Sequence, residues 1–154
     1  EQATLLWAQW VVLSRVLTVA GPDGRGHKLL IPFLDLFNHE RGSAHVLTGR
    51  SDGLLKVVAG APIAEGEQVC ISYGDESTSN ADLLDQYGFV DLSPAMLAPD
   101  QELLRRHPEA VAALGASSVA EDEALLEGGG LSPQARLAVQ LRLQLKRARD
   151  SATS

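Results

Sequence analysis

Apolar positions near the start of the chain repeat at helical spacing. Four apolar side chains of residues 3–19 share one helical face: Leu6, Trp10, Leu13 and Leu17. The pattern predicts a helix that stops at Gly21-Pro22, followed by a turn-rich loop through Gly26. Core packing is the expected role of the tryptophans, Trp7 and Trp10.

The pattern then changes to short segments that alternate in the manner of strands. The segments expected to be strands are 28–31, 45–50, 54–59 and 68–72. Ser51-Asp52-Gly53 is a typical hairpin turn between the second and third segments. Residues 33–39 form an apolar turn that ends in Asn-His, and 62–66 form another turn. Many short strands joined by turns are therefore expected in this part of the chain.

Helix signals return after the last of these strands. Ser79 is a good N-cap with Asp82 three residues later, and Gly88 is a plausible glycine stop. The strand at 68–72 leads to Tyr73, on the turn made by Gly74 and Asp75. Tyr73, Tyr87 and Phe89 thus fall near two chain reversals, where they could share an aromatic pocket, but ordinary core edges are the favoured interpretation of the pattern.

The chain beyond Leu92 is punctuated by proline and glycine and predicts short helices, such as 101–106 and 109–114. Ser132 and Pro133 predict the start of a longer helix that runs to about Arg149. Its basic residues are Arg136, Arg142, Lys146, Arg147 and Arg149. A basic recognition helix would show this pattern, but a solvated helix face is the favoured interpretation.

Charge and composition narrow the classes of function. The 154 residues carry a formal net charge of -7, which argues against a partner rich in phosphate, such as a nucleic acid. No basic residue occurs between Lys56 and Arg105, so the acidic run there would attract a cationic protein. No apolar run approaches the roughly 18 residues of a membrane span. The sequence starts without Met, directly in the first helix, and we expect it to be a fragment.

The cysteine, histidine and serine residues give little support to disulfide, metal or hydrolase chemistry. Cys70 cannot form an intramolecular disulfide and suggests a soluble, reducing compartment, without deciding among chloroplast, cytoplasm and nucleus. A small hydrophobic core residue is its favoured role. Gly42 breaks the helix that a zinc site between His39 and His45 would need, so no metal is expected. The chain lacks the G-x-S-x-G motif of a serine hydrolase.

Three motifs, in order, resemble the SET-domain methyltransferases, in the branch of the Rubisco large-subunit lysine methyltransferase and the actin-histidine methyltransferase. The motifs are W-A-Q-W-V-V-L-S-R at 7–15, I-P-F-L-D-L-F-N-H at 31–39, and the segment at 66–89. The last contains G-E-Q-V-C-I-S-Y-G, S-N-A-D-L-L and Q-Y-G-F. The resemblance implies an α+β fold, in which residues 1–92 are the C-terminal portion of a β-rich, knotted SET domain. Residues 93–154 would be a linker and the start of a helical substrate-binding domain.

The resemblance also implies a function and a set of site residues. The expected activity is S-adenosylmethionine-dependent N-methylation of a protein lysine, or less favourably of a histidine. Tyr73 matches the catalytic tyrosine, and the residues expected to bind the cofactor are Arg15, Asn38 and His39. The residues expected to bind the substrate are Asp35, Tyr87 and Phe89.

The sequence also departs from the family in one respect. The N-terminal SET segment, which grips the other side of the cofactor, is not evident here. The alternative function is therefore a non-catalytic, SET-like module that binds proteins.

Overall fold

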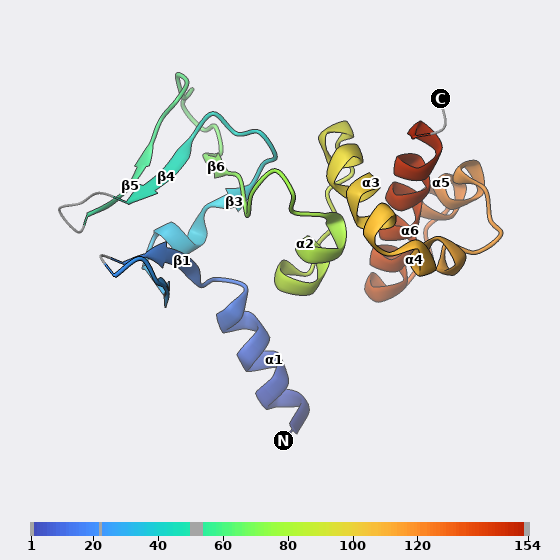
Figure 1. The fold of residues 1–154 in the computed structure, drawn as a ribbon, viewed down its shortest axis with the longest axis horizontal. Helices are drawn as coiled ribbons and strands as arrows, with labels where there is room; N and C mark the ends of the chain where they lie inside the picture. The colour runs from blue at the N-terminus through green and yellow to red at the C-terminus, as the bar shows by residue number, and fades with distance from the viewer. Residues whose placement is uncertain (1, 22, 50–53, 153–154) are drawn as a thin grey trace. The chain divides into compact units, whose positions relative to one another are not determined.

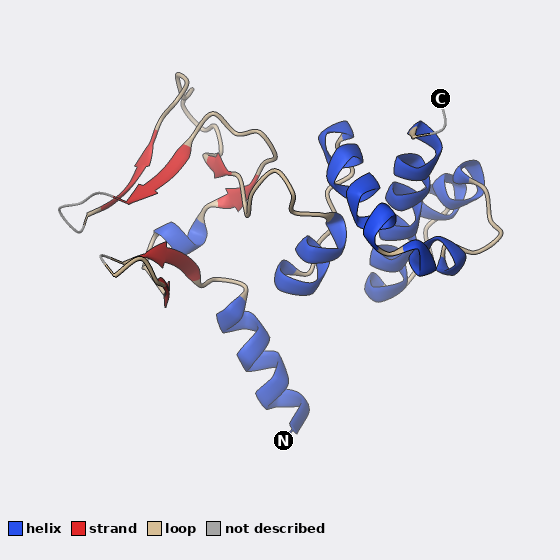
Figure 2. Cartoon of the chain, viewed as in Figure 1, coloured by secondary structure: helices blue, strands red, loops and turns tan. Residues whose placement is uncertain are grey.

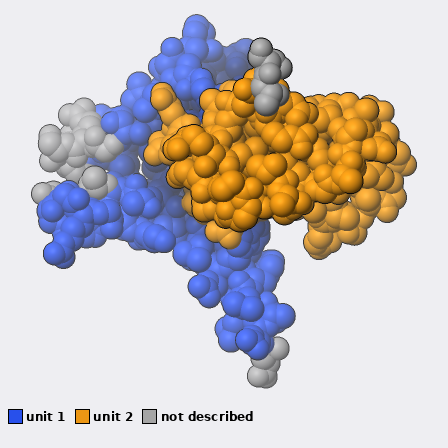
Figure 3. Space-filling view, turned by 45° about the vertical axis from the view of Figure 1, so that its right-hand side comes forward, with its two compact units in different colours: residues 1–73 blue, residues 74–154 orange. Residues whose placement is uncertain are grey.

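The computed structural model describes residues 2–21, 23–49 and 54–152, and its fold is mixed α+β. Helices take 49% and strands 12% of it, so helix outweighs the expected run of strands. The chain forms two compact units, residues 1–73 (unit 1) and 74–154 (unit 2), coloured separately in Figure 3. Figure 2 shows the strands of the described chain in unit 1. The boundary after Leu92 concerns family domains and stays a prediction.

Unit 1 begins with α1 (Gln2–Leu13), followed by β1 (Leu17–Ala20) and β2 (Gly26–Leu29), which pair antiparallel (Figure 1). The helix predicted over 3–19 is thus wrong beyond Leu13. Thr18 and Val19 are β-branched, and they pair with Lys28 and His27 in the ladder. Backbone pairing with the next segment therefore overrides the apolar spacing that had placed Leu17 on the helix.

The tryptophans do not pack in a core, contrary to expectation. Trp7 is 64% exposed and Trp10 is 39% exposed. No residue of α1 among those described is buried. A helix buries its apolar side chains only where another element covers them, and spacing alone does not reveal whether one does.

The rest of unit 1 consists of short elements. They are the 3-10 helix η1 (Leu34–Leu36) and the strands β3 (Asn38–His39), β4 (Val46–Gly49), β5 (Leu55–Val58) and β6 (Cys70–Ile71). β4 and β5 form the expected antiparallel hairpin, whose turn at 51–53 lies outside the described residues. The strand expected at 68–72 is confirmed only for Cys70 and Ile71. Ile71, 4% exposed, is the one apolar side chain in the described part of unit 1 that is buried.

The described part of unit 2 is helical. It contains α2 (Asn80–Tyr87), η2 (Pro94–Met96), α3 (Leu97–Arg106), α4 (Pro108–Ala113), α5 (Val119–Glu127) and α6 (Pro133–Ser151). α6 contacts both α3 and α5 (Figure 1). Leu104, Leu114, Leu145 and Ala148 form a buried apolar cluster. Unit 2 therefore has a core that the described part of unit 1 lacks.

The helix caps of unit 2 confirm the sequence predictions. Ser79 and Asp82 form a reciprocal capping box at the start of α2, which ends at Gly88 with φ 77. That left-handed backbone favours glycine. The Ser132 side chain accepts a hydrogen bond from Ala135 N–H, with Pro133 at the first helical position of α6. The local sequence thus determines where both helices begin.

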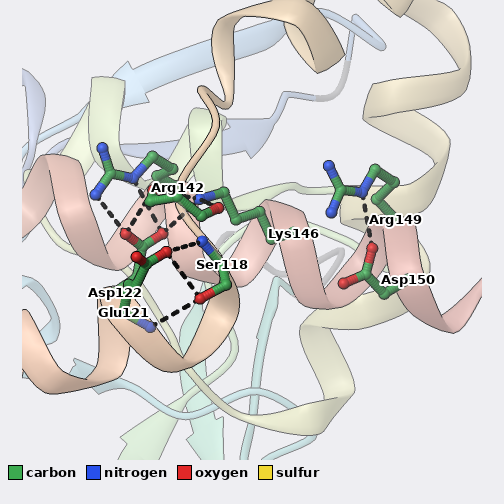
Figure 4. Close-up of polar contacts among 8 residues, drawn as sticks. Ser118, Glu121, Asp122, Arg142, Lys146, Arg149 and Asp150 are labelled. Atoms are coloured by element: carbon green, nitrogen blue, oxygen red, sulfur yellow. Dashed lines mark hydrogen bonds and ion pairs between the residues drawn. The ribbon is translucent and has the colours of Figure 1, made fainter.

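A buried charge cluster on α5 and α6 corrects the expectation of a solvated basic face at Lys146 (Figure 4). The side chains of Asp122 and Lys146 are 0% and 1% exposed, and Lys146 Nζ lies 2.9 Å from Asp122 Oδ2. Arg142 donates to both carboxylate oxygens of Asp122. Burial by itself raises the pKa of Asp122, but hydrogen bonds from Arg142, Lys146 and Ser117 outweigh it and hold the pKa below its usual value.

Candidate functional site

A parallel pairing brings the Asn-His segment beside the strand that leads to Tyr73. In β3 and β6, Asn38 lies opposite Cys70 and His39 lies opposite Ile71. The ladder continues where Glu40 N–H donates to the Ile71 carbonyl at 3.1 Å. Sequence reasoning expected a turn at Asn38–His39, which is wrong, because the pairing with β6 holds both residues extended. In the described chain, the one non-glycine residue with positive φ is instead Phe33.

Tyr73 is fixed at both its backbone and its hydroxyl. Its backbone N–H donates to His39 Nδ1 at 2.9 Å, and its hydroxyl donates to the Phe37 carbonyl. The rings of His39 and Tyr73 lie 5.2 Å apart at 48°. Because Nδ1 accepts a hydrogen bond, the proton of the neutral His39 ring is on Nε2. The structure thus brings together His39 and Tyr73, which are distant in sequence, and orients the phenol.

The bond to Phe37 determines what the Tyr73 hydroxyl offers a ligand. A phenol has one hydrogen to donate and lone pairs to accept with. The hydrogen is directed at the Phe37 carbonyl, so toward a ligand the oxygen acts as an acceptor. An acceptor suits a neutral amine, whose N–H groups donate. Sequence reasoning missed Phe37 because a backbone carbonyl leaves no signature in the sequence.

Arg15 and Asp35 are also in contact, by a hydrogen bond from the Arg15 side chain to the main-chain carbonyl of Asp35. Arg15 Nη1 donates to the Asp35 carbonyl at 2.9 Å, which ties the chain after α1 to η1. An arginine carries five N–H donors, and this bond uses one. Arg15 is exposed, and Asn38 is the exposed member of β3. Their polar groups are therefore accessible to a ligand from solvent.

Cys70, on β6, lacks the features of a reactive cysteine. Desolvation by burial, and secondly the charge of Glu40, raise the pKa of its thiol. A raised pKa reduces the fraction of thiolate, the nucleophilic form. Its carbonyl accepts a hydrogen bond from Ser43 Oγ at 2.8 Å. Cys70 is half-buried, in keeping with its favoured role as a small hydrophobic residue.

The two remaining aromatic residues lie together in unit 2. Tyr87 is the last residue of α2, and Phe89 follows the glycine cap. Their ring centroids are 6.3 Å apart, at an interplanar angle of 43°. Burial raises the pKa of Tyr87, so its phenol stays protonated at neutral pH. The resemblance implies that this pair binds the substrate, and that role stays a prediction.

Several carboxylates of the acidic run between Lys56 and Arg105 accept hydrogen bonds from residues close to them in sequence. Asp75 accepts hydrogen bonds from the Ser77 backbone and hydroxyl, which hold its pKa below the usual value. Glu67 accepts from Ala64 N–H at 2.7 Å, and Asp91 accepts from Ser93 N–H at 2.8 Å. The hydrogen bonds to Asp75 favour its ionised form. Three carboxylates of the run thus accept hydrogen bonds from the backbone and shape local turns.

Gly74 confirms the turn expected after Tyr73. It has φ 69, a backbone region that favours glycine. A Cβ at this position would lie 2.1 Å from Thr78 Oγ1. A side chain at position 74 would therefore strain the turn behind Tyr73 and crowd Thr78.

Comparisons with known proteins assign no family to the chain. No protein-family model matches it, and no curated protein does. Within residues 2–21, 23–49 and 54–152, no three acidic, histidine or cysteine side chains gather in a way that could hold a metal ion. In the same residues, no helix is long and apolar enough to cross a membrane.

Proposed function

We propose that this chain is the C-terminal part of a SET-domain enzyme that methylates a lysine side chain of another protein, with S-adenosylmethionine as cofactor. One observation carries the proposal. The parallel pairing of β3 with β6 sets Asn38 opposite Cys70 and brings His39 against Tyr73, whose hydroxyl is oriented by the Phe37 carbonyl. Residues from two separate motifs of the resemblance thus meet around one phenol.

The accessible donors fit an amino-acid-like cofactor. Arg15 has N–H groups beyond the one that binds the Asp35 carbonyl, and a guanidinium pairs well with a carboxylate. The Asn38 side chain offers both an acceptor and donors to the amino-acid end, while backbone groups near His39 would bind the adenine. When bound, the cofactor supplies a methyl group on a positively charged sulfur.

Tyr73 would act by orienting the acceptor. Transfer forms the N–CH3 bond while the S–CH3 bond breaks, and it requires a neutral amine aligned with the sulfur. The amine loses its proton to solvent before alignment. The Tyr73 oxygen then accepts an N–H of the amine and directs the nitrogen lone pair toward the methyl group. No strong general base is needed.

Charge and resemblance together favour a protein lysine as acceptor. The acidic run between Lys56 and Arg105 attracts cations, and surface charges act mainly on the rate of encounter. We therefore expect methyl transfer to slow as salt screens these charges, over a Debye length of about 8 Å near physiological ionic strength. Lysine is favoured over histidine by the resemblance alone.

Substitution of Tyr73 by Phe tests the proposed mechanism. Tyr73→Phe removes the acceptor oxygen, so turnover should fall by roughly 10²–10³. Calorimetry should detect S-adenosylmethionine binding with little change in affinity between the two proteins. The control is thermal denaturation, which shows whether loss of the bond to Phe37 unfolds unit 1. An unchanged turnover would contradict the role of Tyr73, and absence of binding heat at millimolar cofactor would favour the non-catalytic binding module.

A further inference from the structure

Asn80, the first residue of α2, binds the chain that follows the same helix. Its side chain is fully buried. Asn80 Oδ1 accepts from Asp91 N–H at 2.7 Å, and Asn80 Nδ2 donates to the Asp91 carbonyl at 2.9 Å. The two bonds engage both peptide groups that flank Asp91, so one side-chain amide fixes the position and the orientation of the backbone there.

Asp100 of α3 favours the same orientation of the Asn80 amide that the two bonds to the Asp91 backbone already fix. Its Oδ2 accepts from Asn80 Nδ2 at 2.8 Å, and its Oδ1 accepts from Asn80 N–H at 2.8 Å. Asp100 is itself fully buried. A carboxylate cannot donate a hydrogen bond, so the NH2 group must face it and Oδ1 must face Asp91 N–H. All three hydrogen-bonding groups of Asn80 at this site are thus engaged.

The geometry of α2 makes this contact constrain residues 88–91. The helix of eight residues rises roughly 10 Å from its first Cα to its last. Three residue steps lead from Gly88 back to Asp91 and span at most about 10 Å, so the returning segment is short. Both of its ends are held: Gly88 N–H donates to the Leu83 and Leu84 carbonyls, and Asp91 binds the Asn80 side chain. Phe89, between them, has little freedom to move away from Tyr87.

We propose that Asn80 is the positioning residue for the aromatic pair Tyr87–Phe89. The consequence for substrate binding rests on the proposed function and on the resemblance, which assigns this pair to binding of the substrate. In this proposal Asn80, in the S-N-A-D-L-L segment, holds the aromatic pair in position, and the two aromatic side chains contact the substrate. The competing interpretation is that Asn80 only joins α2 to α3 through Asp100.

Titration of Tyr87 separates the two interpretations without any assay of activity. The chain has two tyrosines, so a Tyr73→Phe background leaves Tyr87 as the single phenol that ultraviolet absorbance follows. Asn80→Ala removes the bonds to Asp91 and frees the returning segment. The midpoint of the pH titration of the Tyr87 phenol (the Tyr87 midpoint) should then fall toward the ordinary tyrosine value of about 10. Asp100→Asn is the matched control, because it alters the link to α3 and leaves the bonds between Asn80 and Asp91 in place, so the midpoint should not move.

Equal shifts in both variants, or none in Asn80→Ala, would overturn the proposal. A second design covers the case in which Asn80→Ala loses helix content by circular dichroism. The exchange Asn80→Asp with Asp100→Asn restores a donor–acceptor pair between α2 and α3 but leaves the Asp91 carbonyl without a donor from position 80. Positioning by Asn80 predicts a lowered Tyr87 midpoint in this double variant, whereas a purely structural link predicts the midpoint of the background protein.

Activity measurements then tell a failure of this proposal from a failure of the proposed function. If methyl transfer occurs, Asn80→Ala should lower kcat/KM for the protein acceptor by roughly 10², with unchanged affinity for S-adenosylmethionine. If the Tyr87 midpoint shifts in Asn80→Ala but the wild type transfers no methyl group, the positioning role is retained and the proposed function is refuted. If methyl transfer occurs but the Tyr87 midpoint does not shift, the proposed function is retained and the positioning role is refuted.

Discussion

Removal of the Asp122 carboxylate should destabilise unit 2 strongly. Lys146 Nζ lies 2.9 Å from Asp122 Oδ2, and both side chains are almost fully buried. At this distance and an effective dielectric constant of about 20, their attraction is about 6 kcal/mol. Burial of each ion opposes it by several kcal/mol, so the intact pair contributes little net stability. Asp122→Asn removes the attraction but leaves Lys146 buried, which we expect to cost about 3–5 kcal/mol.

The chain offers a matched control on the same two helices. Glu123 and Arg147 also join α5 to α6 at 2.7 Å, but their side chains are 42% and 36% exposed. Solvent screens such a pair, so Glu123→Gln should cost at most about 1 kcal/mol. Urea unfolding followed by helical circular dichroism measures both variants, because the described part of unit 2 is helical. The double variant Asp122→Asn with Lys146→Met removes both buried charges and should recover much of the loss.

The dependence on pH follows from the lowered pKa of Asp122. A carboxyl group whose folded-state pKa is lowered contributes stability above the unfolded value, about 4, and loses it as the pH falls through the folded value. The difference between wild type and Asp122→Asn should therefore shrink below about pH 4. A cost for Asp122→Asn no greater than that for Glu123→Gln at neutral pH would refute the reasoning.

Three further predictions concern single residues. His39→Leu leaves the Tyr73 N–H without its acceptor and should lower the free energy of unfolding by about 1–3 kcal/mol in chemical denaturation. His39→Asn retains an acceptor and should lower it less, so equal losses would count against the bond. Ser79→Ala removes the capping box of α2 and should cost about 1–2 kcal/mol by thermal denaturation, and a neutral effect would show that the buried cap is dispensable. Cys70 should react with iodoacetamide more slowly than a peptide thiol at mildly alkaline pH, because its raised pKa leaves less thiolate, and a faster reaction would contradict that direction.

Local signals in the sequence predict the caps and the helix ends well. Ser79 with Asp82, Gly88, and Ser132 with Pro133 each determine hydrogen bonds within a few residues of themselves. Such interactions depend on local backbone geometry and little on the rest of the fold. The hairpin strands at 46–49 and 55–58 were predictable for the same reason, since a short connection joins neighbouring segments.

Features that depend on distant partners were missed or misassigned. Lys146 looks like part of a solvated basic face until Asp122, 24 residues earlier, is placed against it. Leu17 continues a helical apolar pattern until Leu29 pairs with it in a strand. The helix α5, which carries Asp122, was not anticipated. Burial of charge and strand pairing are tertiary effects, and they override intrinsic propensity.

In the candidate site, too, the sequence indicates the residues but not the contacts between residues distant in the chain. The motifs single out Tyr73, Asn38 and His39 by resemblance, but not the interactions that hold them. Neither the acceptor role of His39 Nδ1 nor that of the Phe37 carbonyl has a signal in the sequence. The double contact of Asn80 with the Asp91 backbone depends on the return of residues 88–91 along α2, which only the fold reveals.

The most direct test of the central claim is methyl transfer itself. Protein expressed from the complete coding sequence would be incubated with isotopically labelled S-adenosylmethionine and a mixture of candidate acceptor proteins. Mass spectrometry would then locate the label, with Tyr73→Phe as the matched control. We predict labelled methyl groups on lysine side chains, at a rate that falls by roughly 10²–10³ in the variant. Equal labelling by wild type and Tyr73→Phe, or none by the wild type although it binds the cofactor, would contradict the account.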